Sequence, residues 1–536
     1  MSRAGRLYPT WIIHGGIIHT LEDEDTICQA IAVRGEEILA VGQEDEILAL
    51  AGPGSQRLNL RGQTVLPGLT DAHIHVSMYG RALRQVDCNT DTVNEALSRV
   101  AAKALATPPG SWVLGHGWDQ NRWGGYGHRD ALDRIASSHP VYLTAKSLHA
   151  AWANSAALTA AGLDNDAPDP VGGRLGRDQA GRLTGILFET AMDLVSRTIA
   201  REDADTVKAD LAAAQQQLWE MGVTGVHDFD GPACLAGFQA LRQEGLLGLR
   251  VHKHILVEYL ESAIAVGLRS GFGDDWIRIG SIKVFADGAL GPRTAAMTQP
   301  YDGEPDNFGV AMLDAEELAS IAIRAAEGGF PMAVHAIGDA ANHTVLDAFE
   351  TVRRHESEHG MPLRRHRIEH LQLLHPDDVL RPSKLGLIAS MQPIHALSDR
   401  AMADRYWGDR ARLGYAWHSQ SAAGARLVFG SDAPVESPNP FIGLYAATTR
   451  RGLTPQDREA AWYPEQVVTL REALRGYTTG PAYAAGTEHR SGQLRPGFLA
   501  DLIVLDDDPF RVPPDLLLEM RPVGTMIGGE WRVRQF

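Results

Sequence analysis

Cysteine, long hydrophobic runs and excess positive charge are all scarce in this sequence, and each scarcity excludes a class of protein. The 536 residues include three cysteines, Cys28, Cys88 and Cys234, which are far apart and show no CxxC spacing. This excludes a disulfide framework and a cysteine zinc site, and fits a reducing cytoplasm. No apolar stretch approaches the ~20 residues needed to cross a bilayer, and the N-terminus has too short an apolar run for a signal peptide. The formal net charge of -17 opposes a nucleic-acid partner. We therefore expect a cytoplasmic protein with no membrane and no nucleic-acid partner.

The two ends of the chain share a pattern that its long middle lacks. Hydrophobic residues make up 44% and charged residues 22% of the chain, as in a soluble globular protein of several structural units. Short β-branched runs separated by glycine and acidic clusters occupy 11–42 and return over 492–509 and 523–536. Because neither end alone supplies enough strands to bury a face, we predict one β-sandwich domain from residues 1–64 and 486–536.

The middle alternates short apolar runs with helical stretches rich in Ala, Leu and Glu, which is typical of βα units around a parallel sheet. Candidate strands lie at 65–75, 223–229, 249–257, 277–286, 331–335, 367–371, 387–392 and 427–430. Eight strands are what a TIM barrel requires, so residues 65–76 and 205–485 are predicted to form one. Residues 77–204 are too long for one crossover. The expected fold is therefore α/β: a (β/α)8 TIM barrel, a β-sandwich domain built from both termini, and an inserted subdomain after the first barrel strand that covers the barrel mouth.

The stretch "VLPGLTDAHIH" ends the first predicted barrel strand with two histidines one residue apart. Alternate side chains of a strand share a face, so His73 and His75 both point into the barrel while Ile74 points toward the helices. They lie at the C-terminal end of the strand, where barrel active sites are built. A pair of buried, hydrogen-bonded histidines is the alternative interpretation of so short a motif.

Further candidate ligands belong to later strands. Lys283 lies in the fourth strand, and His335, His370 and Asp432 end the fifth, sixth and eighth. Taken singly, Lys283 could be a solvated lysine, His370 a capping residue and Asp432 a helix N-cap. Together with His73 and His75, they predict a centre at one barrel rim for one or two divalent ions, most simply zinc.

Several motifs along the chain resemble those of the amidohydrolase superfamily, in the YtcJ-like branch (amidohydrolase family 3) that includes N-substituted formamide deformylases. The resemblance covers nearly the whole chain and rests on "LPGLTDAHIH", "HAAWANSAAL", "GRLTGILFETA", "GVTGVHD", "IKVFADGALGPRTA", "VHAIGDAAN", "HRIEH", "GSDAPVESPNP" and "GQLRPGFLADLIVLD". The combination is far more specific than any single motif.

The resemblance implies a role for each candidate ligand. His73 and His75 would bind the more buried metal, and His335 and His370 the second. Asp432 would bind metal and shuttle protons. Lys283 matches a lysine that many superfamily members carboxylate to bridge the two metals. Family habit adds a homodimer to this expectation.

The expected reaction is hydrolysis of a C–N amide-type bond in a small-molecule substrate such as an N-acyl or N-formyl amine. A metal-bound water can have a pKa near ~7, which makes hydroxide available as the nucleophile. Asp432 would act as the general base and return a proton to the leaving nitrogen. The predicted substrate contacts are His149, Trp118, Trp123, Glu189, Arg293, Gln392 and His395. Two of these predictions have structural alternatives: the tryptophans suit an aromatic lid or the insert's own core, and Arg293 suits an anionic substrate group or an ion pair.

Two rival functions remain open from the sequence. The same fold and ligands would serve a deaminase that releases ammonia from a cyclic amidine, and fold alone does not choose between the two reactions. A barrel that has lost catalysis and acts as a small-molecule sensor is the other. The intact ligand set opposes the sensor, which has little need for both Lys283 and Asp432.

Overall fold

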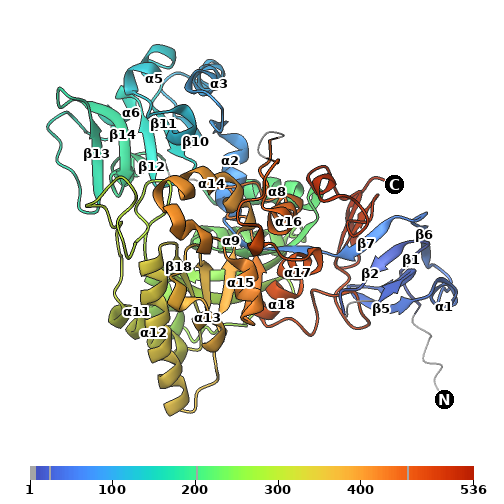
Figure 1. Ribbon diagram of the computed structural model, residues 1–536. Coiled ribbons are helices and arrows are strands. Elements are labelled where there is room, and N and C mark those ends of the chain that lie inside the picture. Colours follow the sequence, from blue (N-terminus) through green and yellow to red (C-terminus); the bar gives the residue numbers. More distant parts are fainter. Residues whose placement is uncertain (1–7, 23–25, 201–202, 455–457) are drawn as a thin grey trace. The chain divides into compact units, whose positions relative to one another are not determined.

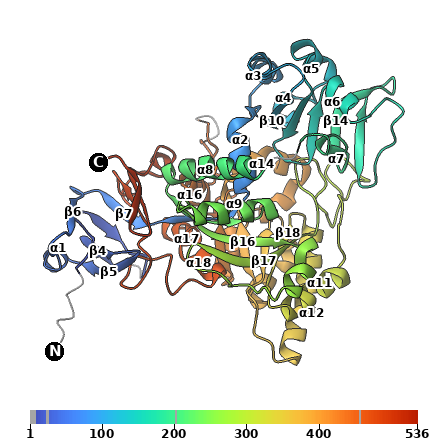
Figure 2. The same cartoon turned by 180° about the vertical axis from the view of Figure 1, so that it is seen from behind.

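The computed structural model describes residues 8–22, 26–200, 203–454 and 458–536, which form two compact units. One unit takes in residues 1–76 and 215–536, and the other takes in residues 77–214. Figure 1 shows the elements of each unit in sequence colours, and Figure 2 shows them from behind.

Eight parallel strands form the central sheet of the first unit. In order around the sheet they are β8 (Leu69–Ile74), β15 (Val223–Asp228), β16 (Arg250–Leu256), β17 (Ile277–Phe285), β18 (Met332–Ala336), β19 (Arg367–His370), β20 (Ile388–Met391) and β21 (Arg426–Phe429). The first and last strands meet where the backbone N–H of Asp432 donates to the carbonyl of His73 at 2.7 Å, and that of His75 to Ala433 at 3.0 Å. The predicted (β/α)8 barrel is confirmed.

Helices surround this barrel (Figures 1 and 2). They are α8 (Ala204–Glu220), which runs on from the second unit, α9 (Pro232–Gln243), α10 (Leu260–Ala265), α11 (Ala315–Glu327), α12 (Asp339–Glu358), α13 (Arg381–Lys384), α14 (Pro393–Tyr406), α15 (Trp417–Ala422), α16 (Pro440–Thr449), α17 (Leu470–Gly476) and α18 (Thr479–Ala485), with short 3-10 turns at Val257–Tyr259, Pro376–Asp378, Gly408–Leu413, Pro464–Gln466 and Pro514–Leu518. Local chemistry sets their starts: Asp314 and Glu317 form a capping box for α11, and proline opens α9, α14 and α16.

Two further sheets of the first unit make the β-sandwich. One has the order β5 (Glu37–Gly42), β4 (Ala30–Arg34), β1 (Trp11–His14), β6 (Gln56–Asn59), with α1 (Glu44–Leu48) against it; the other has β24 (Glu530–Arg534), β23 (Gly524–Ile527), β22 (Leu502–Leu505), β7 (Thr64–Pro67), β2 (Ile17–His19), β3 (Ile27–Cys28). Ile31 of the first sheet and Val65, Val504 and Met526 of the second share one buried core. The sandwich from both termini is therefore confirmed, because β22 from the C-terminal end pairs with β7 from the N-terminal end.

The prediction of one strand over 65–75 is wrong in one respect. The run is two strands, β7 in the sandwich and β8 in the barrel, with Gly68 between them. The N–H of Gly68 donates to the carbonyl of Asp501 at 2.9 Å, and a Cβ at this position would overlap the side chain of Thr224. Glycine lets the chain pass from one sheet to the other where the two pack closely.

The second unit is built around a six-stranded mixed sheet. Its order is β13 (Gly173–Arg177), β14 (Leu183–Glu189), β12 (Ala150–Ala153), β11 (Val141–Ala145), β10 (Val113–Trp118), β9 (Val86–Asp87). Its helices are α2 (Val76–Arg84), α3 (Val93–Leu105), α4 (Gln120–Trp123), α5 (Arg129–Ile135), α6 (Ser155–Ala160) and α7 (Ala191–Ser196). Two separate cores serve it, one around Trp118 and Trp152 and one around Leu158 and Leu187.

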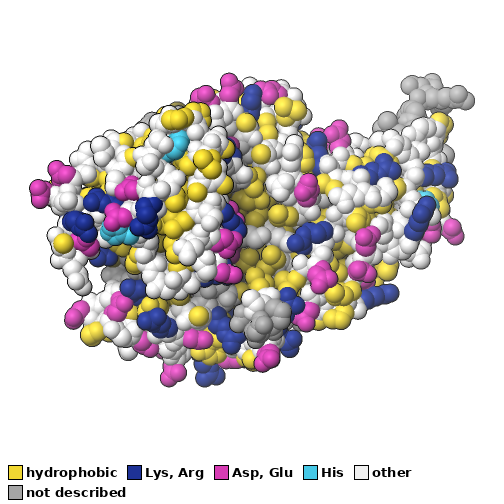
Figure 3. Space-filling model, turned by 90° about the horizontal axis from the view of Figure 1, so that it is seen from above, with side chains coloured by type: hydrophobic (Ala, Val, Ile, Leu, Met, Phe, Trp, Pro, Cys, Tyr) yellow, Lys and Arg dark blue, Asp and Glu magenta, His cyan; other side chains and the backbone are white. Residues whose placement is uncertain are grey.

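The surface carries charges of both signs. On the face seen in Figure 3, Lys and Arg side chains are interspersed with Asp and Glu. No helix in the described part of the chain combines the length and apolar character that a membrane span needs.

Candidate metal centre

His73, His75 and Asp432 converge at the C-terminal ends of β8 and β21. Both histidine Nε2 atoms lie 3.5 Å from Oδ1 of Asp432. His73 is 1% exposed and Asp432 is 9% exposed. The spacing of His73 and His75 therefore places both rings beside one carboxylate, as the sequence predicts. That carboxylate belongs to Asp432, which follows β21, the strand that meets β8 where the barrel closes.

Buried carboxylates fix the orientation of both imidazoles. Nδ1 of His73 lies 2.6 Å from Glu369 Oε2, and Nδ1 of His75 lies 3.1 Å from Asp230 Oδ1. Burial opposes ionisation of Glu369, but Arg367 and His73 lower its pKa to about 2, so Glu369 accepts a hydrogen bond and His73 Nδ1 donates it. The lone pair of His73 Nε2 consequently faces the Asp432 carboxylate, an arrangement that calls for a cation between them.

The pKa shifts of His75 and Asp432 also favour a cation between these side chains. Burial lowers the pKa of His75, but hydrogen bonds with Asp230 and Asp432 outweigh it and raise the pKa to about 10. Burial likewise opposes ionisation of Asp432, yet contacts with His395 and His75 hold its pKa well below the usual range. The structure therefore stabilises positive charge between these side chains and negative charge on Asp432, which fits a divalent cation.

A buried clamp holds Asp432 in place. Asp71 accepts hydrogen bonds from Ser431 Oγ at 2.5 Å, from the Ser431 N–H at 3.0 Å and from the His73 N–H at 3.1 Å. Asp432 has a φ of 61°, a left-handed conformation that costs energy in a residue with a side chain and often marks a functional site. The clamp joins the ends of β8 and β21 and so sets the separation of His73 and Asp432.

The remaining predicted histidines gather around His370, whose ring centroid lies 5.0 Å from that of His73. Ligand atoms of His370, His395 and Asp432 lie within 4.8 Å of one another, and Nε2 of His395 is 3.6 Å from Asp432 Oδ2. His335 lies edge-on to His370, with ring centroids 4.6 Å apart. The carbonyl of Gly288 accepts a hydrogen bond from His335 Nε2 at 2.9 Å, which leaves Nδ1 of that ring as the potential ligand atom.

Lys283 lies in the barrel interior, between two aromatic rings. Its Nζ is 4.8 Å from the ring centroid of Phe229 and 4.6 Å from that of Phe285, and the residue is 2% exposed. Desolvation lowers the pKa of Lys283 to about 8, against the attraction of Glu369 and Asp432. An amine with this pKa is partly neutral near pH 8, and only a neutral amine can react with carbon dioxide.

A second layer of histidines lies beneath the centre. His227, His252 and His254 place ligand atoms within 4.8 Å of one another. Phe229 separates this layer from the metal candidates, because its ring stacks on His73 at 4.1 Å and on His254 at 4.2 Å. This layer, Glu369 and Asp230 were not predicted from the sequence. The signal for Glu369 was present: in "HRIEH", Arg367 and Glu369 alternate on one face of β19.

The predicted substrate contacts of the first unit have different surroundings. Gln392 is buried at the start of α14, and its Nε2 has no hydrogen-bond partner. His395, one turn further along α14, contacts Asp432, so it belongs to the centre itself. Arg293 forms an ion pair with Glu304 at 2.7 Å and lies over the ring of Tyr406, which favours the ion-pair interpretation of this arginine.

The predicted contacts of the second unit form two groups. Nδ1 of His149 lies 2.9 Å from Glu189 Oε2, and both side chains are partly exposed. Trp118 is fully buried, donates its indole N–H to the carbonyl of Leu143 at 2.8 Å and stacks near Trp123. Its indole N–H and one ring face are already used by Leu143 and Trp123, so this environment favours the packing interpretation for Trp118.

The fold and the site together define a barrel protein with a histidine- and aspartate-rich centre at the C-terminal ends of its strands. The model of the amidohydrolase family matches residues 56–533. The chain belongs to this family. It is 31% identical over 530 residues to "Putative amidohydrolase YtcJ" of Bacillus subtilis, covering 97% of this chain and 98% of that one. It is 30% identical over 535 residues to N-substituted formamide deformylase of Arthrobacter pascens, covering 96% of each. The solved structure of an uncharacterized metal-dependent hydrolase from Pyrococcus horikoshii is 27% identical, with a TM-score of 0.77 over 94% of this chain and 99% of that one.

Proposed function

We propose that this protein is a metal-dependent hydrolase that cleaves the C–N bond of a small N-acyl or N-formyl amine. The observation that carries the proposal is the lone pair of His73 Nε2 facing an ionised Asp432 at 3.5 Å inside a buried site. Two acceptors do not lie opposite each other in a low-dielectric interior without positive charge between them. His73, His75 and Asp432 would hold one cation, and His335 and His370 the second.

A divalent cation in such a site polarises a carbonyl oxygen and makes a water molecule more acidic. The protein's own contribution is proton transfer. Asp432 is ionised and therefore able to accept the proton of the attacking water, and the same carboxyl then protonates the leaving nitrogen. His395 Nε2, 3.6 Å from Oδ2, orients the carboxylate during both transfers.

Lys283 would neutralise part of the positive charge if it were carboxylated. An unmodified ammonium at this place would repel two dications, whereas a carbamate would attract them. Its lowered pKa and its position between Phe229 and Phe285 support the proposal that Lys283 carries this modification.

The proposed substrate class rests on the similarity to the formamide deformylase. Asp432 can donate a proton to the leaving nitrogen, which both amide hydrolysis and deamination require, so the relative decides the choice of an acyclic amide. Released amine and acid would support this class, whereas released ammonia would show that the protein is a deaminase of cyclic amidines. We place the reaction in the cytoplasm.

The test combines metal content with turnover. Protein purified without chelator is expected to hold about two divalent ions per chain and to release amine from members of a panel of N-formyl and N-acyl amines. Asp432→Asn should retain metal, since the amide oxygen still coordinates, and should lose turnover by at least a hundredfold. Asp347→Asn, which removes an exposed carboxylate paired with Arg381, is the control and should leave both unchanged. Substantial activity in Asp432→Asn would exclude Asp432 as the base, and absence of bound metal after zinc or manganese is supplied would refute the hydrolase.

A further inference from the structure

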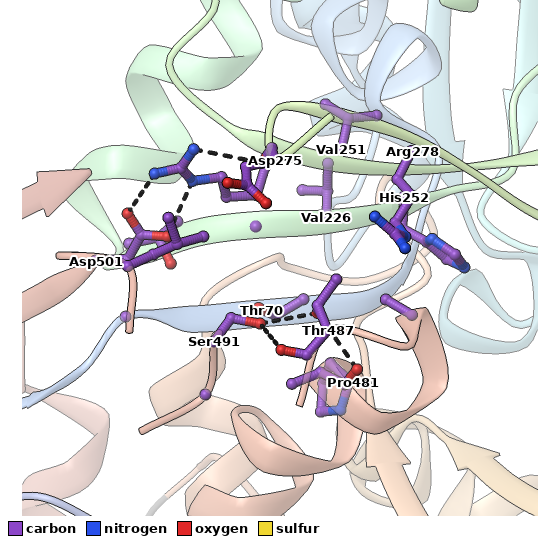
Figure 4. Close-up of a pocket in the computed structure, with 18 of the residues that line it drawn as sticks. Thr70, Val226, Val251, His252, Asp275, Arg278, Pro481, Thr487, Ser491 and Asp501 are labelled. Atoms are coloured by element: carbon purple, nitrogen blue, oxygen red, sulfur yellow. Dashed lines mark hydrogen bonds and ion pairs between the residues drawn. The ribbon is translucent and has the colours of Figure 1, made fainter. Parts of the chain in front are cut away.

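We propose that a pocket at the N-terminal ends of the barrel strands binds a small organic carboxylate. The pocket is lined by the starts of β8, β15, β16 and β17 and by the segment 478–501, and it holds a cavity of about 70 Å³ that opens to solvent (Figure 4). The candidate metal ligands lie at the opposite, C-terminal ends of the barrel strands. This pocket is therefore separate from the proposed active site, and the proposal does not depend on the hydrolysis proposed above.

Three carboxylates line the pocket, and each of them is already neutralised. The pairs are Asp274 with Arg242 at 3.2 Å, Asp275 with Arg490 at 2.8 Å and Asp501 with Arg250 at 3.0 Å. Backbone N–H groups of Trp276 and Ile277 also donate to Asp274. These carboxylates consequently leave little uncompensated negative charge to oppose an anion.

Arg278 is the positive charge of this pocket that lacks a counter-ion. It makes no ion pair or side-chain hydrogen bond with any residue in the described ranges, and its Nε is buried without an acceptor. A β-bulge in β17 accounts for the position of Arg278 in this pocket. Lys253 pairs with Ile279 and Ile255 pairs with Ile282, so β17 has one extra residue between those positions. The bulge allows both Arg278 and Lys283 to face the barrel interior, one at each end.

His252 supplies a second group at the same end of the pocket. It is 6% exposed, and its Nδ1 has no hydrogen-bond partner. Burial, reinforced by Arg367 and Arg278, lowers the pKa of His252 to about 3, so the ring is neutral and can donate one hydrogen bond. Figure 4 shows Arg278 and His252 together at one end of the pocket, with Asp501 at the other. An anion beside Arg278 would satisfy both buried groups.

The walls define the rest of the ligand. Val226 and Val251 form one side, opposite Pro481 and the hydroxyls of Thr487 and Ser491 (Figure 4). Thr487 and Ser491 bond each other at 2.8 Å, so they present polar but uncharged surface. A single charged group next to a short apolar wall fits a monocarboxylate with a short alkyl chain better than a highly charged anion such as phosphate.

The test is titration calorimetry of the full-length protein with sodium butyrate, both metal-loaded and after chelator treatment. We expect saturable binding in both forms, and none for butyramide, which has the same shape without the charge. Arg278→Gln should weaken butyrate binding at least tenfold. Arg324→Gln, which removes an exposed arginine paired with Glu261 away from the pocket, should leave the affinity within twofold.

Ala485→Leu provides a test that leaves Arg278 in place, because it adds apolar volume to the pocket wall. It should weaken butyrate binding at least threefold, and it decides the question if Arg278→Gln does not fold by circular dichroism. Three results would overturn the proposal: no saturable binding, equal affinity in these variants and the wild type, or binding that disappears when metal is removed. The last would place butyrate at the metal centre.

Discussion

Replacement of Glu369 by glutamine should lower both the unfolding free energy of the protein and its affinity for metal, for two different reasons. Glu369 is fully buried and accepts hydrogen bonds from Ser390 Oγ at 2.6 Å, from Arg367 and from His73 Nδ1. Glu369→Gln removes the negative charge but keeps the shape. Arg367 then remains as a buried cation without a carboxylate, which costs about 3–5 kcal/mol of unfolding free energy.

The same change should weaken metal binding. Glutamine can offer its N–H₂ group to His73 Nδ1, which would move the ring proton to Nε2 and block the ligand atom. The loss of a partner that orients a metal-binding histidine typically lowers affinity by about 10–100-fold. The assays are urea unfolding of chelator-treated protein and zinc titration against a competing chelator.

Two controls separate these effects. Glu261→Gln removes an exposed carboxylate paired with Arg324 and should cost less than about 1 kcal/mol without changing zinc affinity. The double variant Arg367→Met/Glu369→Gln removes the uncompensated cation as well, so it should recover part of the stability but none of the zinc affinity. Zinc affinity within twofold of the wild type in Glu369→Gln would refute our account of how His73 is oriented.

Two further predictions concern buried groups. His366 is fully buried, and burial lowers its pKa to about 4 from 6.5 despite the nearby Glu356. Because the unfolded chain binds this proton first, stability should fall as the pH drops from 6.5 toward 4, by roughly 2 kcal/mol at pH 5. His366→Gln should lose that part of the slope in urea unfolding of chelated protein at pH 7 and pH 5; an unchanged slope would contradict it. Gly430→Ala would overlap the His73 amide nitrogen and bring a methyl to 2.7 Å from Asp71, so its metal content should fall to a small fraction of the wild type. Gly125→Ala, where open space surrounds the added methyl, is the matched control, and equal metal content in the two variants would show that the site is not held so tightly.

Much of the fold could be predicted because its signals are local. Most of the eight barrel strands contain a short apolar run bounded by turn residues, and such runs mark buried parallel strands wherever they occur in a chain. The HxH motif placed His73 and His75 on one face of β8 by the period of the strand alone. The sandwich from both termini followed from counting strands that neither end could bury by itself. The break between two strands at Gly68 was not predicted. It depends on the close approach of Thr224 and Asp501, which are distant in sequence.

The chemistry of the centre was predicted only in outline. Residue types and strand ends indicated His73, His75, Lys283, His335, His370 and Asp432, and the barrel brings ligand atoms of His73, His75 and His370 within 4.8 Å of Asp432. The partners that decide protonation were not visible in sequence. Glu369 is 296 positions from His73, and Asp230 is 155 positions from His75; only closure of the barrel makes them neighbours.

The sequence by itself therefore determined the types of secondary structure, the faces of the strands and the inventory of ligands, because these depend on residues a few positions apart. Tertiary structure alone decided which lone pair faces Asp432, which arginine lacks a counter-ion and which tryptophan is buried. Those properties arise from desolvation and from charges within a few ångströms, and both depend on contacts between segments that folding brings together.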